Sequence, residues 1–174
     1  GVALLIADSG NDDVSTLQAA LLHDVLEDTT CTQETLRDKF GDQVLSIVKD
    51  VTDDKSLPKH KRKRAQIEHS LHISTQAKHV KLADKLYNLR DLTTSQPQGW
   101  SLERCRGYFV WSYFVVAGLR GTNAFLEQQL DALFAGNMTF NGKEEKVLPP
   151  KEEMQEFLKN YLEMMEEAGK TEDD

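Results

Sequence analysis

The stretch "KLADKLYNLRDL", residues 81–92, decides the fold of this chain. It ends a longer segment, residues 75–92, whose apolar side chains recur at steps of three: Ala77, Val80, Ala83, Leu86 and Leu89. Residues three or four apart share one face of a helix, so this spacing predicts a long helix with a buried face. Asp84 falls between two of these apolar positions. A carboxylate there is costly to bury alone, and either a metal ion or a neighbouring Lys81 or Lys85 would provide its partner.

The rest of residues 1–135 predicts further helices. We expect seven other helices, near residues 2–7, 13–27, 33–40, 42–51, 59–69, 102–117 and 122–134, and among them the apolar residues at 44, 45, 47, 48 and 51 form a clear helical stripe. Pro58 suits a helix start, and Gly41 is typical of a helix end. The side chains that suit N-caps are Asp13 or Ser15, Thr32 and Ser101. No segment alternates with a period of two, so the predicted fold class is all-α.

The composition fits a single soluble domain without a membrane span. The 174 residues are 39% hydrophobic and 29% charged, and no apolar run approaches the ~20 residues that a bilayer requires. The first residues, "GVALLIADSG", lack the basic region and the long apolar core of a secretory signal. Cys31 and Cys105 lie far apart and have no metal-type spacing. We therefore expect a cytoplasmic protein whose cysteines are free thiols or packing residues.

The net charge of −8 is distributed unevenly. Residues 141–174 hold 5 Lys and Arg against 11 Asp and Glu, so the tail is acidic while the body is close to neutral. This balance argues against nucleic acid as a partner, because nucleic-acid binding needs a basic surface. The basic run "KHKRKR", residues 59–64, is either a solvated helix surface or a patch for a polyanion or for nuclear import.

A second stretch, "LLHDVLEDT" at residues 21–29, places four polar side chains within six positions. On one continuous helix His23 and Glu27 would be four apart, as would Asp24 and Asp28, so all four would face one sector. Imidazole and carboxylate ligands suit manganese or zinc when further ligands come from elsewhere in the fold. The second acidic pair could then orient or deprotonate a water. Acidic residues at a helix end are also commonly just solvated, and these four residues alone leave that alternative open.

The two stretches together resemble a known family. An H-D dipeptide followed 60 residues later by the Asp of "KLADKLYNLR" resembles the HD-domain metal phosphohydrolases. "HDVLEDT" with "VKLADKLYNLRDL" resembles the RelA/SpoT-type hydrolase domain, and "LQAALLHD", "VTDDKSLPKHKRKR" and "GWSLERCRGYFVW" resemble the small metazoan SpoT homologues. The resemblance covers about residues 1–135. It implies an all-α HD-domain helical bundle that uses Mn²⁺ to remove 3′-pyrophosphate from (p)ppGpp, and a family also described as acting on the 2′-phosphate of NADPH.

The resemblance also implies a role for individual residues. The metal ligands that it implies are His23, Asp24 and Asp84. The acidic pair that would activate the attacking water is Glu27 and Asp28. The residues that would contact the nucleotide substrate are Asn88, Arg104, Tyr108 and Lys59. Physical chemistry agrees with these last roles, because a guanidinium grips phosphate through two hydrogen bonds and a phenol can hydrogen-bond or stack.

The start of the chain departs from the family pattern. Family members carry a His-Pro just before a segment like "GVALLIA", and that histidine is a further metal ligand, whereas this sequence begins at Gly1. We expect a fragment or alternative product of a longer active enzyme. The alternative is a short non-catalytic protein that binds a nucleotide or a protein partner without turnover.

The tail is a second departure from the family. We expect a linker at residues 136–150 and an acidic amphipathic helix at residues 151–174. The apolar stripe of that helix consists of Met154, Phe157, Leu158, Tyr161, Leu162 and Met165. The helix could cover an exposed apolar surface of the domain or dock a protein partner, or the segment could come from a misjudged exon.

Overall fold

The computed structural model describes the backbone of residues 1–172 and the side chains of residues 1–169. Its elements are α1 (Val2–Asp8), α2 (Val14–Leu22), α3 (Val25–Asp28), α4 (Gln33–Val51), α5 (Lys59–His69), α6 (Thr75–Thr94), α7 (Leu102–Ala117), α8 (Ala124–Phe134), β1 (Asn137–Phe140), β2 (Lys143–Lys146), a 3₁₀ turn η1 (Lys151–Glu153) and α9 (Met154–Glu172). Helices therefore build the domain, and the predicted all-α class is confirmed. The described residues contain one β-sheet, a short two-stranded hairpin formed by β1 and β2.

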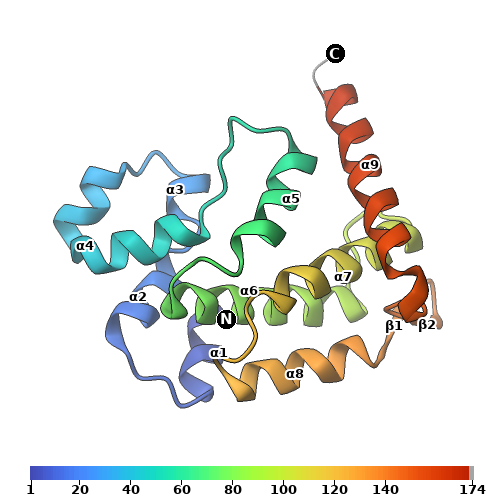
Figure 1. Ribbon diagram of the computed structural model, residues 1–174, viewed down its shortest axis with the longest axis horizontal. Coiled ribbons are helices and arrows are strands. Elements are labelled where there is room, and N and C mark those ends of the chain that lie inside the picture. The colour runs from blue at the N-terminus through green and yellow to red at the C-terminus, as the bar shows by residue number, and fades with distance from the viewer. Residues whose placement is uncertain (173–174) are drawn as a thin grey trace.

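Helix α6 is the central element of the domain. It runs through the middle of the molecule and packs against α1, α2, α4, α7 and α8 (Figure 1). All five apolar residues that predicted its buried face are at most 1% exposed. The helix also buries Leu82, Lys81 and Lys85, which lie outside that face. Burial on most sides of the helix explains why α6 can hold polar groups deep inside the domain.

The helix boundaries follow local capping chemistry. The side chains of Asp13, Thr32 and Ser101 accept hydrogen bonds from the backbone two or three residues inside α2, α4 and α7, as predicted. Gly41 interrupts α4 with a φ of 86°, a left-handed conformation that glycine adopts without a Cβ penalty, so the expected break becomes a kink. The prediction of one helix reaching Glu27 is wrong, because α2 ends at Leu22 and the chain turns before α3.

A β-hairpin occupies most of the segment expected to be a linker, residues 136–150. Strands β1 and β2 pair antiparallel from Asn137↔Lys146 to Phe140↔Lys143. Asn141 and Gly142 form the turn with φ values of 49° and 77°, which is the two-residue type I′ geometry that Asn-Gly favours. Strand β1, Asn-Met-Thr-Phe, alternates over four residues only, and β2, Lys-Glu-Glu-Lys, has no apolar residue, so neither strand gives a clear period of two. The turn dipeptide was therefore the usable signal in the sequence.

Helix α9 packs against α5 and α7 at one side of the molecule (Figure 1). Four residues of its apolar stripe are buried there: Met154, Tyr161, Leu162 and Met165. The Tyr161 ring lies directly over Gly107 of α7, where a Cβ would come within 2.4 Å of it. Most of the apolar stripe that could have docked a protein partner therefore packs against α5 and α7 of the same chain.

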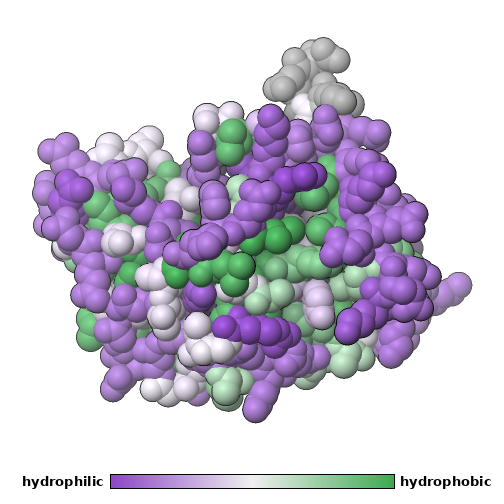
Figure 2. Space-filling view, viewed as in Figure 1, coloured by the Kyte–Doolittle hydropathy of each residue, from purple (hydrophilic) through white to green (hydrophobic). Residues whose placement is uncertain are grey.

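The surface of the domain is mostly hydrophilic but also exposes several large apolar side chains (Figure 2). In Figure 2 hydrophobic residues gather across the middle of the visible face, between hydrophilic flanks. Three of the large apolar side chains that are more than half exposed are Leu4, Leu21 and Tyr87. Within the described part of the chain, no helix is both long and apolar enough to cross a membrane.

Candidate metal and nucleotide site

His23 stands at the turn between α2 and α3. Its Nδ1–H donates to the carbonyl of Ala20 at 2.7 Å, which fixes the ring and leaves Nε2 facing the interior of the site. Nε2 lies 3.1 Å from Asp24 Oδ2 and 3.6 Å from Asp84 Oδ1. The structure therefore brings together the three side chains that the sequence predicted as metal ligands, although α2 and α6 lie about 60 residues apart in the chain.

Asp84 is held by partners from its own helix. Lys85 Nζ lies 3.4 Å from Oδ2, and Asn88 Nδ2 donates to Oδ1 at 3.0 Å. Burial alone would raise the pKa of Asp84, but the Lys85 ammonium and His23 outweigh it and hold that pKa below its usual value. The carboxylate is thus kept ionised in the domain interior. Of the two lysines that the sequence offered as partners, Lys85 is the one that contacts it.

The donor set suits a divalent transition-metal cation. An imidazole anchored through one nitrogen and facing carboxylates with the other is a common ligand arrangement. Hydrogen bonding to Asp84 raises the pKa of His23 to about 9, so a proton competes with a cation for this position. Among the described residues, no group of three or more His, Cys, Asp and Glu side chains is already arranged to hold an ion. Loading would therefore require loss of that proton and a rearrangement of the carboxylates.

The acidic pair of α3 points in two directions, which corrects the expectation that it shares one helical sector with His23 and Asp24. The backbone N–H of Asp53 donates to Glu27 Oε1 at 2.6 Å. Asp28 Oδ1 instead lies 3.3 Å from Lys55 Nζ, and the same ammonium contacts the Glu27 carbonyl. The turn at His23 separates α2 from α3, so His23 and Glu27 no longer lie on one continuous helix, although the Asp28 N–H still donates to the Asp24 carbonyl at 2.9 Å.

Burial raises the pKa of Glu27, since the side chain is only partly exposed. The nearby negative charges of Asp53 and Asp24 act in the same direction. A carboxyl group with a raised pKa is a stronger base than an ordinary surface glutamate, while its bond to the Asp53 backbone fixes its orientation. Glu27 therefore has the environment that proton transfer needs.

A buried polar network supports this part of the site, and sequence reasoning missed it. Gln66 Nε2 donates to both carboxylate oxygens of Asp53, at 3.0 and 2.8 Å. Lys81 Nζ then donates to Gln66 Oε1 at 3.3 Å, and burial lowers the pKa of Lys81 to about 8. The network ties α6 and α5 to the loop that holds Glu27. The signal was a lysine inside a strongly apolar helix, which has to find a polar partner.

Asn88 and Tyr108 share a cavity of about 240 Å³, which Trp100 and Pro97 also line. The Tyr108 ring stands 5.9 Å from the Trp100 ring and 5.2 Å from the Trp111 ring. Such an aromatic wall beside an amide offers stacking and hydrogen bonding to a flat, polar ring. Two of the predicted substrate contacts are therefore neighbours. Trp100 and Trp111 were not among the predicted residues.

Cationic side chains lie against the rings of Trp100 and Trp111. Arg104 lies 4.5 Å from the Trp100 ring, and its buried Nε has no hydrogen-bond partner. Lys63 and Lys85 share the Trp111 ring, with Nζ atoms 3.6 and 4.4 Å from its centroid. Burial lowers the pKa of Lys63 well below its usual value, and the positive charges of Lys85 and Lys59 add to this effect. So many cations in one place favour a polyanionic ligand.

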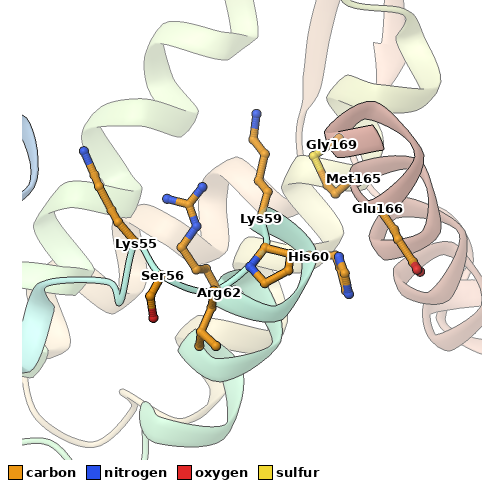
Figure 3. Close-up of a pocket in the computed structure, with 10 residues that line it drawn as sticks. Lys55, Ser56, Lys59, His60, Arg62, Met165, Glu166 and Gly169 are labelled. Carbon is orange, nitrogen blue, oxygen red and sulfur yellow. The ribbon is translucent and has the colours of Figure 1, made fainter. Parts of the chain in front are cut away.

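Lys59 lies apart from the Asn88–Tyr108 cavity. It lines a separate cavity of about 590 Å³ between the start of α5 and α9, which we call the α9 pocket (Figure 3). The α5 side of this pocket carries Lys55, Lys59, His60 and Arg62, and its α9 side carries Met165, Glu166 and Gly169. The structure thus divides the predicted substrate contacts between two cavities.

Comparison with known proteins agrees with this geometry. Residues 1–106 match the family model of the HD domain. The chain is 57% identical over 135 residues to the guanosine-3′,5′-bis(diphosphate) 3′-pyrophosphohydrolase MESH1 of Danio rerio, covering 77% of this chain and 75% of that protein. The chain belongs to the MESH1 family of HD-domain proteins. The MESH1 protein of Homo sapiens is 54% identical with the same coverage.

A solved structure extends the likeness to three dimensions. It is described as a metazoan ortholog of SpoT that hydrolyzes ppGpp and plays a role in starvation responses, and it superposes with a TM-score of 0.75. The two chains share 51% sequence identity, and the match covers 76% of this chain and 75% of the other. The HD-domain bundle predicted from the sequence is therefore confirmed. Helix α9 lies beyond residue 106, where the match to the HD-domain family model ends.

Proposed function

We propose that this chain is a metal-dependent hydrolase of phosphorylated nucleotides that removes 3′-pyrophosphate from guanosine-3′,5′-bis(diphosphate). The observation that carries the proposal is the meeting of His23 with Asp24 and Asp84, beside a glutamate anchored for proton transfer. The activity stated in the names of the MESH1 relatives supports the choice of substrate.

His23, Asp24 and Asp84 would hold the cation, Mn²⁺ in this proposal, which would supply a Lewis acid that polarises the scissile phosphate and makes water easier to ionise. Lys85 keeps Asp84 ionised and therefore ready to act as a ligand. The bond from His23 to the Ala20 carbonyl keeps the proton on Nδ1, which leaves Nε2 for the cation.

Glu27 acts as the general base. As a water oxygen adds to the 3′ phosphorus, Glu27 accepts the proton that this oxygen loses. The bond between that phosphorus and the ribose 3′ oxygen breaks, and the ribose oxygen takes up a proton, so the products are GDP and pyrophosphate. Asp28, held by Lys55 on the other side of α3, acts on the site through its negative charge near Asp24 and makes no direct contact with this water in our proposal.

The neighbouring residues bind the nucleotide. Asn88 and Tyr108 line the cavity that suits the nucleoside, with Trp100 as a stacking surface. Arg104 grips a phosphate oxygen through the guanidinium whose Nε lacks a protein partner. Lys63 and Lys85 balance the remaining negative charge near the scissile bond.

Product analysis tests the proposal directly. The full chain is incubated with Mn²⁺ and guanosine-3′,5′-bis(diphosphate), and ³¹P NMR follows release of pyrophosphate. Replacing Glu27 with Gln should lower kcat by about 10²–10⁴-fold, because general-base catalysis contributes on that order. The control is Glu34→Gln at an exposed position of α4, which should retain full activity. An active Glu27→Gln variant would remove the acidic pair from the mechanism.

The second candidate substrate, NADPH, is tested in a parallel incubation with Mn²⁺ in which release of phosphate is measured.

A nucleotide-binding protein without turnover is the second candidate. The observation that favours it is that the described residues contain no ligand set already arranged around an ion. Calorimetric titration with Mn²⁺ separates the two candidates. Saturable binding that is lost in Asp84→Ala supports the hydrolase, whereas nucleotide binding without any Mn²⁺ binding supports the alternative.

A further inference from the structure

The α9 pocket is basic on one wall and open to solvent. Lys55, Lys59 and Arg62 contribute three cationic groups, and Figure 3 shows these three side chains extending to the same side, with Met165 of α9 near Lys59. Across residues 1–169, neither Lys59 nor Arg62 forms an ion pair, and the buried Arg62 Nε has no hydrogen-bond partner. Glu166 is the acidic residue in the lining. The pocket therefore offers unsatisfied donors to an anion.

Two sets of contacts connect this pocket to the candidate metal site. Lys55 lines the pocket and also contacts Asp28 and the Glu27 carbonyl on α3. Along α5, Lys59 stands one turn before Lys63, whose ammonium shares the Trp111 ring with Lys85. Lys85, Lys63 and Lys59 thus place positive groups at successive positions between Asp84 and the α9 pocket. A ligand with negative charge at both ends matches that distribution better than a ligand with one charged end.

We propose that the α9 pocket binds the second phosphorylated end of the nucleotide, so that α9 selects substrates that are phosphorylated at both ends. The assignment of ends rests on the proposed function, since it places the 3′-diphosphate at His23 and Asp84 and the 5′-diphosphate in the α9 pocket. Phosphate binds well where guanidinium and ammonium groups converge, and α9 limits how far that end can extend.

Gly169 allows a test with little risk to folding. It lines the pocket, and a Cβ built at this position meets no atom within 4 Å. Three substitutions, Gly169→Glu, Gly169→Gln and Gly169→Lys, place a negative, neutral or positive group beside the basic wall with similar bulk. Asn160→Glu is the matched control, because it adds the same charge to the same helix but lines a different cavity.

Affinity is measured by calorimetry in EDTA, where turnover is suppressed, for two probes. These are guanosine-3′,5′-bis(diphosphate) and guanosine 3′-diphosphate, which lacks the 5′ phosphates. For the first probe, Gly169→Glu should weaken binding roughly three- to tenfold relative to Gly169→Gln, and Gly169→Lys should strengthen it similarly, because one unit charge acts across several ångströms of partly solvated space. The second probe should bind all three variants equally, and Asn160→Glu should match the wild-type chain for both.

Each other outcome overturns the proposal. Equal affinity of the Glu and Gln variants for the bis(diphosphate) shows that the pocket does not hold its 5′ end. Equal losses of affinity for both probes show only that the added negative charge weakens the binding of any anionic ligand. Absence of binding by the wild-type chain also overturns it. The proposed function is judged separately by pyrophosphate release with Mn²⁺, so a charge-dependent affinity without hydrolysis refutes the function alone. Hydrolysis without charge dependence refutes the pocket alone.

Discussion

Replacing Gly107 with Ala should loosen the attachment of α9. A Cβ at this position would lie 2.4 Å from Tyr161 Cδ2, 2.7 Å from Cγ and 2.9 Å from Cβ. All three separations are far inside van der Waals contact, and Tyr161 is only 2% exposed, so its ring cannot swing away without exposing the interface. Either α9 shifts as a body or Tyr161 adopts a strained rotamer.

The expected loss in free energy of unfolding is about 1–3 kcal/mol, which is the usual effect of adding a methyl group to a packed core. For a chain of this length, each 1 kcal/mol lowers Tm by about 2–4 °C. Urea denaturation followed by circular dichroism measures the change. Gly169→Ala is the matched control, since a Cβ there meets open space, and a helical Gly→Ala change should raise stability by about 0.5–1 kcal/mol.

A double-mutant cycle identifies Tyr161 as the cause. Tyr161→Ala alone should destabilise the chain by about 3–5 kcal/mol, as expected for truncation of a large buried aromatic ring. In that background the added methyl at residue 107 has room, so Gly107→Ala should no longer destabilise the chain and should instead raise its stability by about 0.5–1 kcal/mol, as Gly169→Ala does. Additive losses would refute the argument, because they would mean that the methyl group does not meet the Tyr161 ring.

Two predictions concern the polar site. Asp84→Asn leaves the Lys85 ammonium, 4% exposed, without its carboxylate, so the chain should lose about 3–5 kcal/mol of stability. The pKa of His23 should also fall from about 9 towards its ordinary value, and an unchanged His23 titration by NMR would contradict the pairing. Because this pKa is raised in the folded chain, the stability that His23 contributes without metal is complete below about pH 6.5. It is lost as pH rises to about 9, so wild type should lose more stability than His23→Gln between pH 6.5 and 9, and equal losses would refute this linkage.

The sequence was sufficient for the parts of the fold that rest on spacing. The five apolar positions of α6 predicted a buried face, and all five are buried. The N-caps at Asp13, Thr32 and Ser101 also follow local rules, because a capping oxygen needs only its own helix start. The turn at His23 is held instead by a ring that bonds back to Ala20 and by the Asp84 carboxylate that α6 brings to it. Spacing along α2 does not contain that information.

The same distinction applies to the site. His23, Asp24 and Asp84 could be grouped from sequence because the motif that contains them is specific, and the structure places their side chains together. The apolar helix around Lys81 signalled that this lysine needs a polar partner, but the sequence does not identify Gln66 as that partner, and Lys63 within the basic run carries no pattern that distinguishes it from a solvated lysine. Packing of α6 buries Lys81, and Gln66 then gives its ammonium a partner that only the packing of α5 against the domain brings within reach.

The basic run on α5 and the stripe on α9 explain each other once they are considered as one interface. The sequence left open whether the run is a solvated helix surface or a patch for a polyanion, because its charges spread around the helix. Four-residue spacing nevertheless puts Lys59 and Lys63 on one face, while Lys61 and Arg64 stay exposed. That face can meet the apolar stripe of α9 because lysine stems are aliphatic, and the Lys63 ammonium ends 5.4 Å from the centre of the Tyr161 ring. Such an interface buries apolar stems while it turns ammonium groups towards a pocket, so the attachment of α9 and the charge of the α9 pocket depend on the same residues.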